Sequence, residues 1–401
     1  MRFPSLLAAL ALCTPLCAQG EVPPPQIGQT NPLPGLKPPA IPGTNVQQVH
    51  MIHLPGDAPN VFHTALTVAG LPAANGGVGG TDLLTGKYDV LTDTFTPNTE
   101  AAALNAAGTE FGLMFHHTGL HAVYDRLPGP PILAKRASLG SPWQVVGTIT
   151  GLPSQSYYDP ALATFKGRTY LLHVLGTGIA MTAIDLNTGA LSTPSGVIVN
   201  AARSGSTANS PTPIVDSKGE LIAISHHDVL GSDNDHYMSM DLDPATPALL
   251  FNDTPTWTNN GGFIGGRFFD AESTPSPYHI FAIDAFWTTG GRAPVGGAME
   301  LRAFVPPSAT PGNQVSWLLV GAGFLQPPLP VPPFVGMFGL NNVLITLPLG
   351  MHNNLNGEAL LTVQVPNIPG LSGAKVPVQS FTLHPTTGTG TVGNTALLTV
   401  D

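Results

Sequence analysis

A short strand–turn–strand unit recurs along this chain, and it constrains the fold more than any other feature of the sequence. Positions 157–185 read YYDPALATFKGRTYLLHVLGTGIAMTAID. Runs of β-branched, aromatic and small apolar residues alternate there with glycine turns, one of them at Lys166-Gly167. We therefore expect strands at 158–164, 169–175 and 180–186. Together they would form an antiparallel meander, the unit of a β-propeller blade.

Similar segments flank this one at comparable spacing. Gly108, Gly167 and Gly219 lie 59 and 52 residues apart, and strand-like runs border each of them. A fourth, weaker copy follows when Tyr278 is aligned with Tyr170. Such spacing indicates a repeat architecture, although any all-β chain offers some matches by chance. The sequence thus predicts an all-β fold with a β-propeller of about five blades.

The composition agrees with this fold class. Charged residues make up only 9% of the chain, whereas glycines number 46 and prolines 42. Turns should therefore be frequent, and no apolar run at helical spacing follows the N-terminus. The formal net charge of −10 argues against nucleic acid and anionic membrane surfaces as partners. We expect a monomer.

Positions 1–19 have the features of a secretory signal peptide. Arg2 precedes an apolar run at 6–12, and the small residue Ala18 stands at the expected cleavage site. The run is too short to span a membrane. Both cysteines, Cys13 and Cys17, lie in this segment, so the processed chain would depend on its core rather than on disulfides. We expect a secreted protein, extracellular or periplasmic, with no membrane span.

The rest of the chain divides by proline content and strand pattern. Positions 20–45 hold eight prolines and predict a polyproline-like linker or a surface arm. Positions 46–306 form the predicted propeller. A proline cluster then marks a boundary, and positions 312–401 show alternating strands, Asn/Gly/Pro turns and few charges. This pattern predicts a C-terminal β-sandwich domain, in which no active site is expected.

The repeat alignment predicts which residues meet at the propeller mouth. Aligning the glycines places Glu100 on Asp159, and two carboxylates there could act as a general acid/base pair. Further polar residues fall at or beside the same position and are candidates for substrate binding: Tyr158, Asn209, Ser210 and Arg267. The alternative is that Asp159 caps a turn beside Pro160 and the others bind channel water.

The chain holds 13 histidines, a high number for so few charges. Four fall near the ends of second strands in successive copies: His116, His173, His226 and His279. A ring of neutral imidazoles could bind a divalent metal ion such as Zn²⁺ or Mn²⁺, or one could act as a base beside Tyr158 in a lyase reaction. For each histidine alone, a buried and hydrogen-bonded side chain is the commoner case. The sequence leaves the cofactor open.

Two segments resemble known families. YDPALATFKGRTYLLHV and SPWQVVG, whose Trp143 would plug between neighbouring sheets, resemble the five-bladed β-propeller glycosidases such as arabinanases and xylosidases. VQVPNIPGLSGAKVPVQSF and GNTALLTV are similar to C-terminal sandwich modules of secreted bacterial proteins. The first likeness implies cleavage of carbohydrate at the propeller mouth. However, those enzymes carry a general-acid Glu before Gly-Pro in the third blade, where this chain has Asn209-Ser210-Pro211.

Two functions therefore stay open on the sequence. One is a secreted propeller that acts on carbohydrate, as a glycoside hydrolase or a polysaccharide lyase. The other is a non-catalytic extracellular propeller that binds glycans or has a structural role. Both take a carbohydrate or another small molecule as ligand, and they differ in whether Glu100 and Asp159 face each other in an open pocket.

Overall fold

The fold is all-β, as the composition predicted. A computed structural model gives the coordinates, and three 3₁₀ turns are the only helical segments in the part of the chain that it describes. No helix in that part is both long and apolar enough to cross a membrane. The predicted signal peptide and Tyr158 lie outside the described residues, which are 26–33, 35, 45–54, 56–58, 60–152, 159–192, 196–230, 233–239, 248–251, 258–272, 279–306, 314–353 and 356–401.

The contacts divide the chain into two compact units. The first comprises residues 30–264 and 268–283, and the second comprises 1–29, 265–267 and 284–401. The second unit thus includes residues that the sequence assigned to the propeller. The reason is strand pairing: β22 (Ala298–Phe304) is hydrogen-bonded along its whole length to β25 (Glu358–Gln364).

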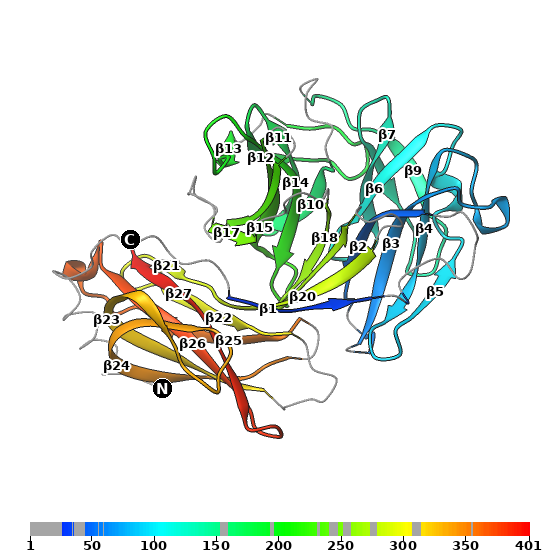
Figure 1. Ribbon diagram of the computed structural model, residues 1–401. Helices are drawn as coiled ribbons and strands as arrows, with labels where there is room; N and C mark the ends of the chain where they lie inside the picture. The colour runs from blue at the N-terminus through cyan, green and yellow to red at the C-terminus, as the bar shows by residue number, and fades with distance from the viewer. Residues whose placement is uncertain are drawn as a thin grey trace. The chain divides into compact units, whose positions relative to one another are not determined.

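The first unit contains four antiparallel sheets of four strands, each a meander in chain order (Figure 1). The predicted meander around Gly167 is one of them. The first sheet holds β2 (Asn45–Ile52), β3 (Val61–Ala69), β4 (Thr81–Asp89) and β5 (Thr94–Asn98), and the second holds β6 (Thr109–Phe115), β7 (His121–Leu127), β8 (Ile132–Lys135) and β9 (Gln144–Thr148). The third holds β10 (Ala161–Phe165), β11 (Arg168–Leu175), β12 (Gly178–Ala183) and β13 (Val197–Val199), and the fourth holds β14 (Thr207–Val215), β15 (Leu221–Leu230), β16 (Asp233–Ser239) and β17 (Ala248–Phe251).

Three further strands follow the four meanders: β18 (Thr258–Ile264), β19 (Arg267–Glu272) and β20 (His279–Thr288). The proline-rich segment supplies β1 (Gln26–Pro32), which pairs with β20, so part of the expected linker is a strand. Beyond β1, the Leu33 amide donates to the Ile280 carbonyl at 2.9 Å. The Gly35 amide donates to the Asp93 carboxylate at 2.9 and 3.0 Å. These bonds fix the arm to the first unit.

The first strands of successive sheets meet one another. β2 contacts β6, β6 contacts β10, β10 contacts β14, β14 contacts β18, and β18 contacts β2. Separate apolar clusters fill the spaces between adjacent sheets. Trp143 is fully buried in one of them, between residues of the first and second sheets, and it stacks on Phe115 at 5.7 Å. Its predicted place between neighbouring sheets is confirmed.

The second unit contains a five-stranded sheet and the β22–β25 pair. The sheet order is β21 (Gly291–Ala293), β27 (Thr389–Val400), β26 (Lys375–His384), β23 (Val315–Pro330) and β24 (Met337–Met351). A single apolar core draws side chains from the sheet and from the pair. Arg302 and Glu358 form a buried ion pair at 2.8 Å beside this core.

Candidate functional site

The first strands of four successive sheets share an irregular position. It lies seven to nine residues before the glycine of the first turn, and its residues are Gln48, Gly112, Asp159 and Ser210, before Gly56, Gly119, Gly167 and Gly219. The last three have positive φ angles of 66°, 47° and 49°, which is uncommon for Asp and Ser. In β6 and β14 the pairing register shifts at this position. Such bulges turn a residue out of the ladder, here towards the neighbouring first strands.

The residues at this position bond to one another and to two residues of second strands. Ser210 Oγ donates to Asp159 Oδ2 at 2.9 Å, and the Asp159 amide donates to Asp125 Oδ2 at 3.1 Å. The Gly112 amide donates to Thr67 Oγ1 at 3.1 Å. We call these residues, with Gln48, the hub cluster. Gly112 leaves room for it, because a Cβ there would lie 2.3 Å from Asp159 Oδ1 and 3.1 Å from Gln48 Oε1.

The two aspartates of the hub cluster are buried acids. Their exposed fractions are 3% for Asp125 and 7% for Asp159. Burial, and then the charge of Asp159, raises the pKa of Asp125 to about 8. Burial also raises the pKa of Asp159, against the opposing effect of the hydrogen bond from Ser210. Two carboxyl groups in one desolvated place share protons, so the pair holds a proton at neutral pH.

The sequence alignment named Asp159 and Ser210 but not their partner Asp125. A signal was present: Asp125 stands inside the apolar strand sequence HAVYDRL, and an acid in a buried strand needs polar partners. Gln48 and Thr67 carried no comparable signal, because single polar residues are frequent on strands. Asn209, beside Ser210, pairs with His227 across β14 and β15, and its Oδ1 has no partner among the described residues.

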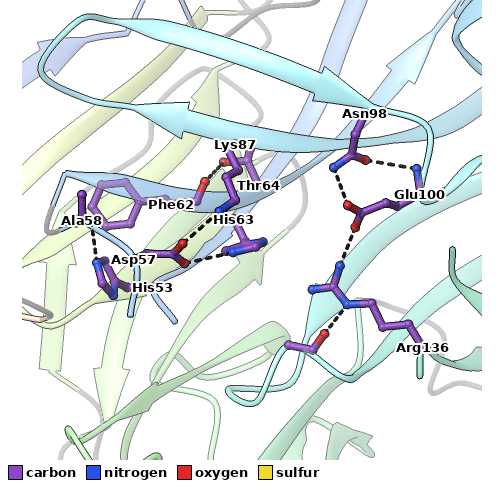
Figure 2. Close-up of polar contacts among 11 residues, drawn as sticks. His53, Asp57, Ala58, Phe62, His63, Thr64, Lys87, Asn98, Glu100 and Arg136 are labelled. Carbon is purple, nitrogen blue, oxygen red and sulfur yellow. Dashed lines mark hydrogen bonds and ion pairs between the residues drawn. The ribbon is translucent and has the colours of Figure 1, made fainter. Parts of the chain in front are cut away.

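Glu100, the predicted partner of Asp159, is bonded elsewhere. Arg136 Nη1 donates to its carboxylate at 2.5 Å and Asn98 Nδ2 at 3.0 Å, as Figure 2 shows. The Arg136 side chain is buried and lies over Trp143, 4.5 Å from the ring centroid. Among the described residues, Glu100 and Asp159 share no hydrogen-bond partner.

The register explains this separation. Gly108 precedes β6, the first strand of its sheet, whereas Gly167 follows β10, the first strand of the next. The structural counterpart of Gly167 in the second sheet is Gly119, in the turn between β6 and β7. The upstream copy was thus aligned about one strand out of step. The downstream alignment of Gly219 with Gly167 agrees with the structure, and it is the one that brought Ser210 to Asp159.

Arg267 is displaced for the same reason. It opens β19, which follows β18 in its sheet, rather than a first strand. Its Nε donates to Asp284 Oδ1 at 3.0 Å, and both residues belong to the second compact unit.

The expected ring of metal-binding histidines is not assembled by the three members whose side chains are described. His116 bonds to the hydroxyls of Thr118 and Thr164 at 3.0 and 2.9 Å. His173 contacts the Thr182 hydroxyl at 2.8 Å. In the described part of the chain, no three His, Cys, Asp or Glu side chains are grouped as metal ligands. The His279 side chain lies outside the described residues.

His226 differs from these two histidines because neither ring nitrogen has a partner among the described residues. It is fully buried and stacks on Tyr237, with 5.9 Å between the ring centroids. Burial lowers its pKa to about 3. A neutral imidazole is therefore the form that the folded chain holds.

A second polar group, missed from the sequence, surrounds Asp57. Its carboxylate contacts His63 Nε2 and Lys87 Nζ, both at 2.9 Å (Figure 2). Burial lowers the pKa of His63, and the charge of Asp57 acts in the opposite direction. His53 Nε2 bonds to the Ala58 carbonyl at 2.9 Å in the same turn. These contacts hold the turn between β2 and β3, and the charge of Asp57 is paired with that of Lys87.

Comparison with known proteins gives no family. No protein-family model matches the chain, and no curated protein matches its sequence. Among solved structures, an exo-inulinase from Aspergillus awamori has a TM-score of 0.38 at 10% identity, covering 90% of this chain and 92% of that one. A GH43 β-xylosidase/α-arabinofuranosidase from a compost microbial metagenome has 0.37 at 9% identity, covering 65% of this chain and 95% of that one.

A β-propeller domain of Cps50 (Swd1) from Myceliophteria thermophila has a TM-score of 0.29 at 9% identity, covering 65% of this chain and 99% of that one. All three scores are too low for these likenesses to bear on the function of this chain. The class that the geometry itself defines is an all-β protein built from four-stranded antiparallel meanders.

Proposed function

We propose that this protein is a secreted, non-catalytic extracellular protein that binds glycans or has a structural role. We further propose that its first unit is a five-bladed β-propeller and its second a β-sandwich. One observation carries the functional part. The carboxyls at the predicted reaction centre are bonded to the protein's own groups: the buried Asp159 to Ser210, and the partly buried Glu100 to Arg136.

Contacts between strands support the proposed architecture. The cyclic order of β2, β6, β10, β14 and β18, with β18 against β2, is that of five blades around an axis. One apolar core shared by two layers of strands supports the sandwich. Secretion rests on the sequence of the first 19 residues.

The test separates binding from cleavage. The chain from residue 20 onward is immobilised and probed with neutral and acidic polysaccharides, and the same polysaccharides are assayed for released reducing ends or unsaturated products. We expect retention of at least one neutral glycan and no product. Asp159→Asn and Glu100→Gln should bind as the parent chain does. Product formation that Asp159→Asn abolishes would contradict the proposal.

A second candidate, cleavage of a glycan, is favoured by the coupled acids Asp125 and Asp159. In many glycosidases one carboxyl of a pair has a raised pKa and acts as the acid while the other is ionised, and the pKa of Asp125 is raised to about 8. The catalytic partner of Asp159 in that case would be Asp125 rather than Glu100. This candidate requires that Asp125→Asn and Asp159→Asn each abolish turnover and that Glu100→Gln does not.

A further inference from the structure

The second unit contains a cavity that arises from an irregularity between β23 and β24. Phe324 pairs with Leu340, and the next pair along the ladder is Leu329 with Phe338. Four residues of β23, 325–328, therefore stand opposite the single residue Gly339. Two of the four are prolines, which cannot donate to a ladder. The surplus segment arches out of the sheet and leaves space beneath it.

This space is a cavity of about 420 Å³, lined by residues 324–328, Gly339 and Thr395. Its size lies within the range of small-molecule sites in proteins, about 300–1,000 Å³. The ring of Phe324 and those of Pro327 and Pro328 give it apolar walls. Gly339 keeps it open, because a Cβ there would lie 3.0 Å from Thr395 Cγ2 and 3.8 Å from Pro328 Cβ.

Of two buried polar side chains beside the cavity, Gln379 is hydrogen-bonded and the hydroxyl of Thr395 is not. Gln379, fully buried on β26, accepts from the Gly339 amide at 3.0 Å and donates to the carbonyls of Met337 and Gly393 at 2.8 and 2.7 Å. Thr395 pairs with Gln379 across β26 and β27 and is 1% exposed. Thr395 lines the cavity, and its hydroxyl has no hydrogen-bond partner within the described residues. A buried hydroxyl without a partner is costly, by roughly 1–3 kcal/mol.

The charge around the cavity restricts what could fill it. None of its lining residues is charged, and positions 315–351, which comprise β23, β24 and their connection, contain no Asp, Glu, Lys or Arg. An ionic ligand would lose its hydration there without gaining a counter-charge. A pure hydrocarbon would leave the Thr395 hydroxyl unsatisfied. A neutral molecule with an apolar face and a hydroxyl group meets both conditions.

We propose that this cavity is a binding site for a neutral sugar ring, packed on Phe324 and the two prolines and hydrogen-bonded to the Thr395 hydroxyl. This inference rests on the proposed glycan-binding function and locates that function in the second unit. The hub cluster of the first unit then serves to hold the strands together.

The test uses the chain from residue 20 onward and neutral trisaccharides (xylotriose, cellotriose and maltotriose), with trigalacturonate as the charged probe. Affinity is measured by calorimetry and saturation-transfer NMR. We expect at least one neutral sugar to bind and trigalacturonate to bind at least tenfold more weakly. Thr395→Val should weaken binding about five- to tenfold, the loss of one hydrogen bond, and Gly339→Val, which fills the cavity, should abolish it.

Thr391→Val is the matched control, since Thr391 lies on the same strand, is buried, and also has a hydroxyl with no described partner, yet does not line the cavity. It should bind as the parent does, and thermal unfolding should show that each variant folds. If a neutral sugar binds and both Thr395→Val and Gly339→Val leave its affinity unchanged, this site is refuted while the glycan-binding function stands. If none of the sugars binds the parent chain, this site and the glycan-binding function both fail, and only the structural role is left.

Discussion

The two compact units bury their apolar side chains in different ways. The first unit divides its apolar side chains among separate clusters between neighbouring sheets, and its first strands meet at a polar hub that includes Asp125 and Asp159. In the described residues the second unit has a contiguous apolar core, to which Leu318 and Val320 of β23 and the β22–β25 pair contribute. Its hairpin of β23 and β24 carries no charge at all.

This difference shows where each unit can carry ionisable groups. Where the first strands of the first unit meet, their side chains have too little room for a large apolar core, so small and polar residues such as Gly112 and Ser210 lie there. Each polar residue there needs a hydrogen-bond partner. Because Asp125 and Asp159 lie close together, the protonation of one affects the pKa of the other. In the second unit apolar side chains form the core, and ions such as Arg302 remain buried only in pairs.

The largest expected effect comes from the single core of the second unit. Leu318→Ala removes a fully buried side chain and should lower the free energy of unfolding by about 3–4 kcal/mol. Since the core is contiguous, calorimetry should show the whole thermal transition of this unit at a lower temperature. Leu133→Ala is the matched change in the first unit, at a cluster between two sheets. We expect Leu133→Ala to speed amide hydrogen exchange only in the second and third sheets. Faster exchange throughout the first unit would show that its clusters are not separate.

The next effect depends on pH and concerns Asp125. Its pKa in the folded state, about 8, lies above its ordinary value of 3.8. The resulting stabilisation is complete below pH 3.8 and is lost as the pH rises through 8. In the parent chain the free energy of unfolding should therefore fall between pH 5 and 8. Asp125→Asn should make this fall smaller by on the order of 2 kcal/mol. Denaturant titrations at each pH would measure this.

A control for the pH effect is the exposed turn residue Asp185, whose pKa is lowered by hydrogen bonds from Asn187 and Thr188. Asp185→Asn should leave the slope between pH 5 and 8 as it is in the parent. A slope equally steep in Asp125→Asn would show that the hub acids are not coupled as described. Below pH 6.5 the lowered pKa values of buried histidines such as His226 act in the opposite sense, because the unfolded chain then takes up protons.

A smaller effect is expected at Glu100. Glu100→Gln removes the charge that faces the buried guanidinium of Arg136 but keeps an acceptor, so a loss of about 1–2 kcal/mol should follow. Because Arg136 lies over Trp143, a change in tryptophan fluorescence should accompany it. If stability and fluorescence stay unchanged while a glycan-cleaving activity disappears, Glu100 would act as the sequence first suggested.

The smallest effect should come from Lys87, whose side chain is half exposed. Its ion pair with Asp57 is screened by solvent, and Lys87→Ala should change the unfolding free energy by less than about 0.5 kcal/mol. Chemical denaturation at low and high salt would measure the pair. A larger loss would mean that the Lys87–Asp57 pair stabilises the fold as much as a buried ion pair does. The expected difference between exposed and buried ion pairs would then be wrong.

Much of the fold could be predicted from local pattern. Glycine turns and short β-branched runs predicted the meander around Gly167, and the Pro-rich boundary predicted a second group of strands with few charges. The site was predicted only where the alignment was in step. Gly219 and Gly167 occupy equivalent turns, so Ser210 and Asp159 were brought together, whereas Gly108 lies one strand earlier and misplaced Glu100. A repeat of alternating strands looks alike when it is shifted by one strand, since strands and turns recur within each sheet as well as between sheets.

The sequence by itself determined that the chain is all-β, because strand periodicity and turn residues act over a few neighbouring positions. It also determined that one region would be free of charge. Only the tertiary structure decided which distant polar residues meet: Asp125 with Asp159, Glu100 with Arg136, and Thr395 with an open cavity. Such meetings depend on register and on bulges, and a shift of one residue or one strand changes every partner while hardly changing the local pattern.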